Sequence, residues 1–157
     1  FNWAKKLVSR FHDEGIKNIF LDFHAEVTSE KRIMLMMFKN QISAICGTHT
    51  HVGTDDLQIF ENTAYLTDIG LTGCRDNVIG MDSKIPIQKV TTGIGGHFEV
   101  PNSCKSILQM LVVDIDDGKA SSAFKIKKYC NNSKLFITEA FIDWDLNYTE
   151  LIKIRIK

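Results

Sequence analysis

The chain has 157 residues, 44% of them hydrophobic and 24% charged, and its 19 basic and 19 acidic side chains cancel at pH 7. This length and composition are typical of one globular domain. The balanced charge gives no reason to expect stable nucleic-acid binding, and no apolar run approaches the roughly 20 residues of a membrane span, so no membrane partner is predicted either.

The first third of the chain alternates between helix and strand patterns. Apolar residues at helical spacing predict an amphipathic helix over residues 2–15. The short apolar run at residues 17–23 predicts a buried strand, residues 28–40 a second helix, and residues 41–47 a second strand. Strand, helix and strand within about thirty residues are typical of a βαβ crossover, so we expect the two strands to be parallel.

Beyond residue 56, short β-like runs dominate the sequence. The one later helix candidate is at residues 82–93. Strands are predicted at residues 57–60, 64–70, 97–100, 107–116 and 119–129, and an alternating pattern predicts another at residues 149–157. The sequence therefore predicts an α/β fold with a βαβ start and a mostly β second half.

Histidines follow both strands of the predicted parallel pair. His24 comes directly after the first strand, and His49 and His51 follow the second. The carboxyl ends of parallel strands meet at one edge of a sheet, so we expect the three imidazoles to converge there. In extended backbone, residues two apart point the same way, which would let His49 and His51 bind one ion or straddle two.

A His-x-His pair alone is a weak signal, because it occurs in many loops that bind no ion. His24 at the end of the neighbouring strand makes a metal site the favoured interpretation, since neutral imidazole is a good ligand for divalent metals. His12 and His97 lack such neighbours, and we expect them to be structural or solvated. The candidate carboxylates for orienting the ligands are Asp22, Glu26, Asp55, Asp56 and Asp68.

The four cysteines are scattered along the chain, with no Cys-x-x-Cys pair. Neither a zinc knuckle nor a disulfide framework is indicated, so we expect reduced thiols and a cytoplasmic protein. Cys46 lies at the end of an apolar strand, where a thiol is more often buried and inert than nucleophilic.

Four segments resemble a known family. "DFHAEVTSEK" (22–31), "GTHTHVGTDD" (47–56), "TAYLTDIGLTG" (63–73) and "VIGMD" (78–82) occur in the order and spacing of the carboxyl-terminal half of the bacterial YmdB-like metallophosphoesterases. The resemblance covers about residues 1–130 and leaves residues 131–157 as an extra tail. It implies half of a metallo-dependent phosphatase-like α/β/β/α sandwich.

The resemblance also implies an enzyme, a metal-dependent phosphodiesterase that hydrolyses 2′,3′-cyclic nucleotides or related phosphoesters. It implies two divalent metal ions, iron or manganese first and zinc or magnesium as alternatives, with His24, His49 and His51 as ligands. In such enzymes the other ligands and the histidine that protonates the leaving group come from an amino-terminal half. We therefore expect this chain to be a fragment that is inactive alone and contains no catalytic residue besides the metal ligands.

Two other functions are compatible with the sequence. A non-catalytic interaction or regulatory module would retain the phosphoesterase fold without its chemistry. An amidohydrolase also uses His-x-His at a strand end, but it requires a barrel of repeated βα units, which the β-rich second half disfavours. The favoured partner is a cyclic nucleotide or phosphodiester substrate, and assembly into a homo-oligomer is left open.

Overall fold

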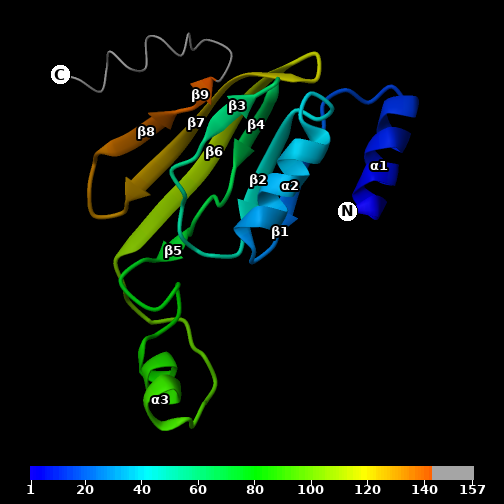
Figure 1. The fold of residues 1–157 in the computed structure, drawn as a ribbon. Coiled ribbons are helices and arrows are strands. Elements are labelled where there is room, and N and C mark those ends of the chain that lie inside the picture. The colour runs from blue at the N-terminus through cyan, green and yellow to red at the C-terminus, as the bar shows by residue number, and fades with distance from the viewer. Residues whose placement is uncertain (143–157) are drawn as a thin grey trace, which may run out of the picture.

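The structure, a computed structural model that describes residues 1–142, contains two stacked β-sheets with α1 and α2 on the side of the first sheet (Figure 1). The helices are α1 (Asn2–Asp13), α2 (Thr28–Phe38) and α3 (Lys84–Thr92). The first sheet contains, in spatial order, β1 (Phe20–His24), β2 (Ala44–Thr48), β4 (Thr63–Leu66), β3 (Gln58–Phe60) and β9 (Phe141–Ile142). The second contains β5 (Gly73–Cys74), β6 (Ser106–Asp116), β7 (Lys119–Tyr129) and β8 (Leu135–Glu139). No helix among the described residues has the length and apolar character needed to cross a membrane.

The start of the chain forms the predicted βαβ unit. β1 and β2 are parallel, with His24 opposite Thr48 at their carboxyl ends, and β4 continues the parallel arrangement on the other side of β2. β2 is buried along nearly its whole length because the sheet is covered on both faces there. β1 was predicted to be buried but is only half-buried, because it is the edge strand of the described sheet. Phe20 at its start is 54% exposed.

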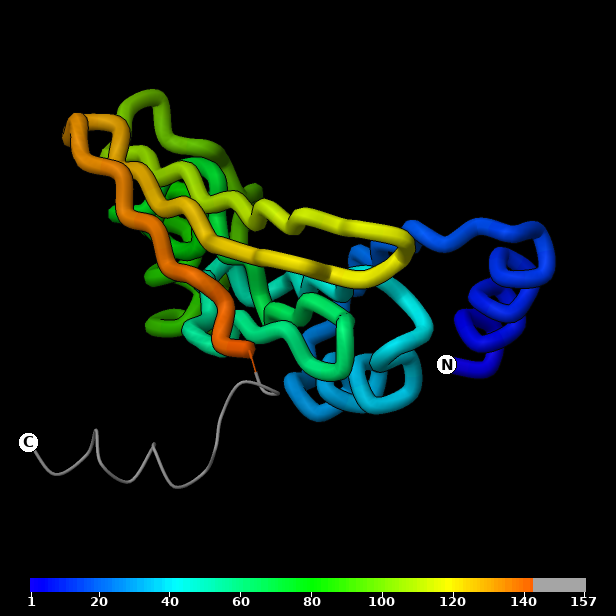
Figure 2. Tube along the Cα trace, turned by 90° about the horizontal axis from the view of Figure 1, so that it is seen from above, coloured from blue at the N-terminus to red at the C-terminus, as the bar shows by residue number. Residues whose placement is uncertain are grey.

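Two clusters of buried side chains hold the layers together. The first lies between the helices and the first sheet and contains Val8, Ile19, Met34, Leu35, Phe38, Ile42, Ile45 and Tyr65. The second lies between the two sheets and contains Ala44, Leu57, Ile59, Ala64, Leu66, Ala120 and Ala123. Several members of the second cluster are alanines, which lets the hairpin of β6 and β7 approach the first sheet closely (Figure 2).

The hairpin of β6 and β7 is tied to the first sheet at its tip. Asp117 and Gly118 form its two-residue loop, and both have the positive φ (45° and 86°) that a type I′ turn requires. Lys17 Nζ lies 2.6 Å from Asp117 Oδ1, and the Gly118 N–H donates to Asn18 Oδ1 at 2.9 Å. The tip therefore contacts the segment that leads into β1.

The later elements match the predictions only in part. The helix predicted at residues 82–93 is confirmed as α3, which lies apart from both sheets (Figure 1). The strand predicted at residues 97–100 is wrong: these residues are exposed, and no strand of the described chain lies beside them to pair with. Residues 135–142 add one strand to each sheet, because β8 pairs with β7 and β9 with β3. The strand predicted at residues 149–157 lies outside the described residues.

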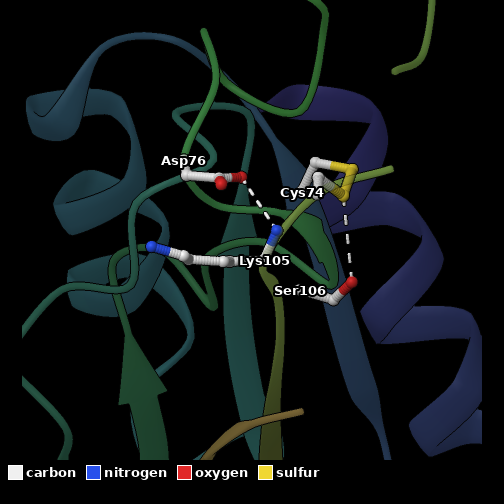
Figure 3. Close-up of a disulfide and its surroundings, with 5 residues drawn as sticks. Cys74, Asp76, Lys105 and Ser106 are labelled. Carbon is white, nitrogen blue, oxygen red and sulfur yellow. Dashed lines mark hydrogen bonds between the residues drawn. A yellow bond between two sulfur atoms is a disulfide. The ribbon is translucent and has the colours of Figure 1, made fainter. Parts of the chain in front are cut away.

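Cys74 and Cys104 form a disulfide, which corrects the prediction of four reduced thiols (Figure 3). The two cysteines are 30 residues apart in the sequence, so no short spacing indicated the pair. They meet because β5 pairs with the start of β6, where Cys74 lies opposite Ser106. Cys46 and Cys130 are free thiols.

Candidate metal centre

The candidate site lies at the carboxyl ends of β1 and β2. His24 is the last residue of β1, and the loop that carries His49 and His51 begins directly after Thr48, the last residue of β2. Because the two strands are parallel and in register, both deliver histidine to the same edge of the sheet.

The rings of His24 and His49 lie against one another. His24 Nε2 is 3.1 Å from His49 Nδ1, and the ring centroids are 4.9 Å apart. Two nitrogens that each bind one ion at about 2.1 Å, at tetrahedral or octahedral angles, are about 3.0 to 3.4 Å apart. The spacing of these two imidazoles therefore fits two ligands of a single divalent ion.

Hydrogen bonds beside His24 define which of its nitrogens is free to bind. The Thr48 hydroxyl lies 3.4 Å from Asp22 Oδ1, and an ionised carboxylate can only accept, so Thr48 donates its proton there. The same Thr48 oxygen is 3.1 Å from His24 Nδ1 and accepts the proton of that nitrogen. The lone pair of the neutral ring is consequently on Nε2, the nitrogen that faces His49.

His51 points to a different neighbour. Its Nδ1 donates to the backbone carbonyl of Ile79 at 2.8 Å, because a carbonyl oxygen can only accept, and its lone pair is therefore on Nε2. A carbonyl partner on the second ring nitrogen is common for histidines that bind metals. Within residues 1–142, however, no three histidine, cysteine or carboxylate side chains are grouped closely enough to hold an ion. The structure thus brings two of the three predicted ligands together, and the assignment of all three stays a prediction.

The backbone of the histidine loop is unusual for residues with a side chain. His49 has φ 125° and His51 has φ 61°, and Ile79, whose carbonyl His51 contacts, has φ 46°. Positive φ is uncommon for residues other than glycine and is least favourable for a β-branched residue such as isoleucine. Neighbouring contacts must hold these conformations in place.

Asp68 supplies those contacts from the segment after β4. It accepts the Thr50 N–H at 2.9 Å and the Gly70 N–H at 3.0 Å, and Lys31 Nζ lies 3.1 Å from the same carboxylate. Burial by itself raises the pKa of Asp68, but the hydrogen bonds from Thr50, Gly70 and Lys31 outweigh it, so the pKa lies below its ordinary value. An ionised Asp68 therefore fixes the residue between the two histidines of the loop.

The structure narrows the set of carboxylates proposed to orient the ligands. Asp22 acts on His24 through Thr48, and Asp68 acts on the loop through Thr50. Asp56 instead accepts hydrogen bonds from Thr67, which directly follows β4. The sequence placed all of them near the site but gave no means of choosing, because the choice depends on contacts between strands.

A hollow of about 300 Å³ opens beside His51. Arg75, Gln109 and Lys127 are among the residues that line it. None of them was predicted, because they come from the loop after β5 and from β6 and β7, far from the histidines in sequence. No local motif marks them, and only the pairing of the second sheet brings them together.

Cys46 is expected to resist alkylation in the native chain. Burial raises the pKa of its thiol to about 12, and the nearby Asp22 and Asp68 carboxylates add to the effect, so the reactive thiolate is scarce. Exposed Cys130 is the internal control. Iodoacetamide near neutral pH should label Cys130 at least about 100-fold faster, as followed by peptide mass spectrometry. Equal labelling rates would show that Cys46 is accessible.

Comparisons with known proteins agree with this fold. A novel phosphatase from Mycoplasma pneumoniae superposes with a TM-score of 0.64 and 28% identity, over 96% of this chain and 50% of its own. A hypothetical protein from Thermus thermophilus gives a TM-score of 0.65 and 26% identity, over 79% of this chain and 45% of its own. The fold is therefore the mixed α/β fold of the metallophosphoesterase type.

Sequence comparison identifies the family. The profile described as YmdB-like protein matches residues 1–128, and the chain belongs to that family. A relative from Bacillus subtilis (strain 168), named 2′,3′-cyclic-nucleotide 2′-phosphodiesterase, is 43% identical over 115 residues, which are 73% of this chain and 43% of that protein. The chain thus spans about half the length of the relatives it matches.

Proposed function

We propose that the chain supplies histidine metal ligands to a metal-dependent phosphodiesterase that hydrolyses 2′,3′-cyclic nucleotides. The observation that carries the proposal is the pair formed by His24 and His49, whose nitrogens have the spacing of two ligands on one ion. The name of the Bacillus subtilis relative supports the reaction and the substrate class. The cytoplasm is the proposed location, although disulfides are uncommon there.

The proposed role of this chain is to bind the metal ions and so to orient the phosphate of the substrate. Divalent ions, for which we propose iron or manganese, would offset the charge that develops on the phosphoryl oxygens and make a nucleophile available from water at neutral pH. His24 and His49 would hold one ion through neutral nitrogens, and His51 is the third proposed ligand. Water adds to phosphorus, the bond from phosphorus to the 2′ oxygen breaks, and that oxygen leaves as a hydroxyl. Its proton comes from a donor that we expect outside this chain.

The purified chain alone is expected to bind Mn²⁺ weakly and to hydrolyse little 2′,3′-cyclic AMP. Neutral ligands without carboxylates leave the charge of a divalent ion poorly balanced. A fusion that places the amino-terminal half of the Bacillus subtilis relative before Phe1 should hydrolyse this substrate. Titration calorimetry with Mn²⁺ and release of the 3′-nucleotide measure the two properties.

The matched variants separate ligation from general damage to the fold. His24→Ala with His49→Ala should abolish Mn²⁺ binding by the chain and hydrolysis by the fusion. His97→Ala removes an exposed imidazole that is not a proposed ligand and should change neither. Full activity of the fusion without His24 and His49 would exclude the proposed role and favour a non-catalytic module. Rapid hydrolysis by the chain alone would exclude the fragment hypothesis.

A further inference from the structure

The hollow beside His51 continues across the second sheet. It shares Arg75 with an adjoining hollow of about 280 Å³, which is also lined by Lys105, Tyr129, Asn131 and Asn132. We call these two hollows together the basic groove. A third hollow shares Lys127 and Tyr129 but contains Asp55, whose charge would oppose an anion, so it is not included.

The cations of the basic groove are available to an anion. Among residues 1–142, no carboxylate lines either of its hollows. The ion pairs between side chains of residues 1–142 join Arg10 to Glu14, Lys17 to Asp117, Lys31 to Asp68 and Lys39 to Glu61. Arg75, Lys105 and Lys127 are in none of them. Three positive charges therefore line one path that begins at His51.

The disulfide between Cys74 and Cys104 joins the two backbone segments that carry Arg75 and Lys105 (Figure 3 shows the disulfide and Lys105). Arg75 follows Cys74 and Lys105 follows Cys104, so the bond between the cysteines joins the backbones that carry both. The Arg75 N–H donates to the Lys105 carbonyl at 3.0 Å, and the Lys105 N–H donates to Asp76 Oδ1 at 3.1 Å. Lys105 and Asp76 are not among the ion pairs between side chains of residues 1–142.

The far end of the basic groove offers a flat surface and amide groups. The guanidinium carbon of Arg75 lies 4.6 Å from the ring centroid of Tyr129. Because Arg75 lies over the Tyr129 ring, a base would stack on the guanidinium plane, a surface on which unpaired bases are known to stack. Neighbouring cations would bind the phosphates. The side chains of Asn131 and Asn132 can donate to and accept from base edges. The combination fits nucleotides of a single strand.

From this arrangement we infer that the basic groove binds the 5′-flanking nucleotides of a short single-stranded RNA whose 3′ end carries a 2′,3′-cyclic phosphate. The inference rests on the proposed function, which puts the cyclic phosphate at the histidines. When the 2′ hydroxyl of RNA attacks the adjacent phosphodiester, the strand is left with such an end, so this group occurs on oligonucleotides as well as on free nucleotides. Each nucleotide on the 5′ side adds a phosphate that a cyclic mononucleotide lacks.

The proposed contact between the basic groove and RNA is short, so it does not require the chain to have a net positive charge. It involves Arg75, Lys105 and Lys127, whereas the chain as a whole has no excess of positive charge. Such a groove selects among substrates and does not form a stable complex with long nucleic acids. A tetranucleotide should bind about tenfold more tightly than the mononucleotide, a difference of about 1.4 kcal/mol. The reason is that its additional phosphates and bases contact the groove.

The test is binding to the metal-free chain, which does not depend on hydrolysis. Fluorescence anisotropy follows a tetrauridylate that has a 5′ fluorescein and a 3′-terminal 2′,3′-cyclic phosphate, with 2′,3′-cyclic UMP as competitor. Arg75→Ala with Lys105→Ala should weaken tetranucleotide binding about tenfold. It should also reduce the slope of log K against log salt concentration by about 1.4 in magnitude, because each of two lost phosphate contacts accounts for about 0.7. Arg10→Ala with Lys6→Ala on α1 removes the same charge outside the groove and should change neither quantity.

The possible results separate this inference from the proposed function. Equal affinity for tetranucleotide and mononucleotide, or equal losses in the groove variant and the α1 variant, would overturn the inference. If the tetranucleotide bound as expected while the fusion hydrolysed nothing, the inference about the basic groove would stand and only the proposed function would be excluded. If the fusion hydrolysed 2′,3′-cyclic AMP and the groove variant bound the tetranucleotide normally, the proposed function would stand. The inference that the basic groove binds RNA would be excluded.

Discussion

Lys31→Met is expected to lower the free energy of unfolding of the chain by about 3 to 5 kcal/mol, because it leaves the Asp68 carboxylate buried without its cation. Both side chains are almost completely inaccessible, with Lys31 1% exposed and Asp68 0% exposed. The N–H groups of Thr50 and Gly70 would remain, but they do not carry a full positive charge. Urea denaturation followed by circular dichroism measures the loss.

A surface ion pair provides the matched control. Lys39 Nζ lies 2.6 Å from Glu61 Oε1, but the two side chains are 32% and 51% exposed, so Lys39→Met should cost less than about 1 kcal/mol. Lys31→Met with Asp68→Asn should recover part of the loss, since no uncompensated charge is then buried. If Lys31→Met and Lys39→Met were equally stable, the buried pair would not have the importance assigned to it.

The buried pair of Lys31 and Asp68 also makes the stability of the folded chain depend on pH. The pKa of Asp68 is lower in the folded chain than its unfolded value of about 3.9, so its ionisation contributes stability that is fully present above that pH. This stability is lost as the pH falls through the folded pKa. Lys31→Met removes one of the contacts that lower the pKa, so acid unfolding of the variant should begin at a higher pH than in the parent chain.

Gly47→Ala is expected to destabilise the chain by about 3 kcal/mol or more, at the upper end of the range for overpacking. A Cβ at position 47 would lie 1.8 Å from the Thr67 carbonyl oxygen and 2.7 Å from its carbon. These are backbone atoms of the segment that leads to Asp68, so they cannot move aside as a flexible side chain does. The strand end before the histidine loop would have to shift, which should also weaken Mn²⁺ binding by the fusion.

Gly95→Ala is the control for this substitution. Within the described part of the chain, a Cβ there would meet only the Lys89 side chain, at 3.8 Å. The substitution at this exposed site should change the free energy of unfolding by less than about 0.5 kcal/mol. Thermal unfolding of both variants gives the comparison. A Gly47→Ala chain as stable as the Gly95→Ala chain would mean that β2 and the segment after β4 are packed more loosely than the structure indicates.

The fold was predictable where the signals are local. α1, α2, α3 and the parallel pair of β1 and β2 follow from helical spacing, short apolar runs and the turns between them. The segment at residues 97–100 has the same local pattern but no neighbouring strand to pair with, so the pattern alone was insufficient. The disulfide depended on a pairing between strands that no spacing in the sequence indicates.

The site was predictable in position but not in detail. The sequence placed His24 and His49 at one sheet edge, and the structure brings their rings together. The argument for His51 assumed an extended loop, in which residues two apart point the same way. The positive φ values of His49 and His51 break that alternation and direct His51 to Ile79. Burial of Lys31 beside Asp68 was also beyond the sequence, because a lysine on a helix is ordinarily solvated.

The backbone of the histidine loop also limits how this lineage could evolve. With φ of 125°, position 49 favours glycine, and with φ of 61°, position 51 tolerates glycine, asparagine or aspartate far better than valine, isoleucine or threonine. Relatives that retain this loop but lack the two imidazoles should therefore be enriched in Gly at position 49 and in Gly, Asn or Asp at position 51. The residues at these two positions would then record the backbone of the loop even where both histidines have been replaced.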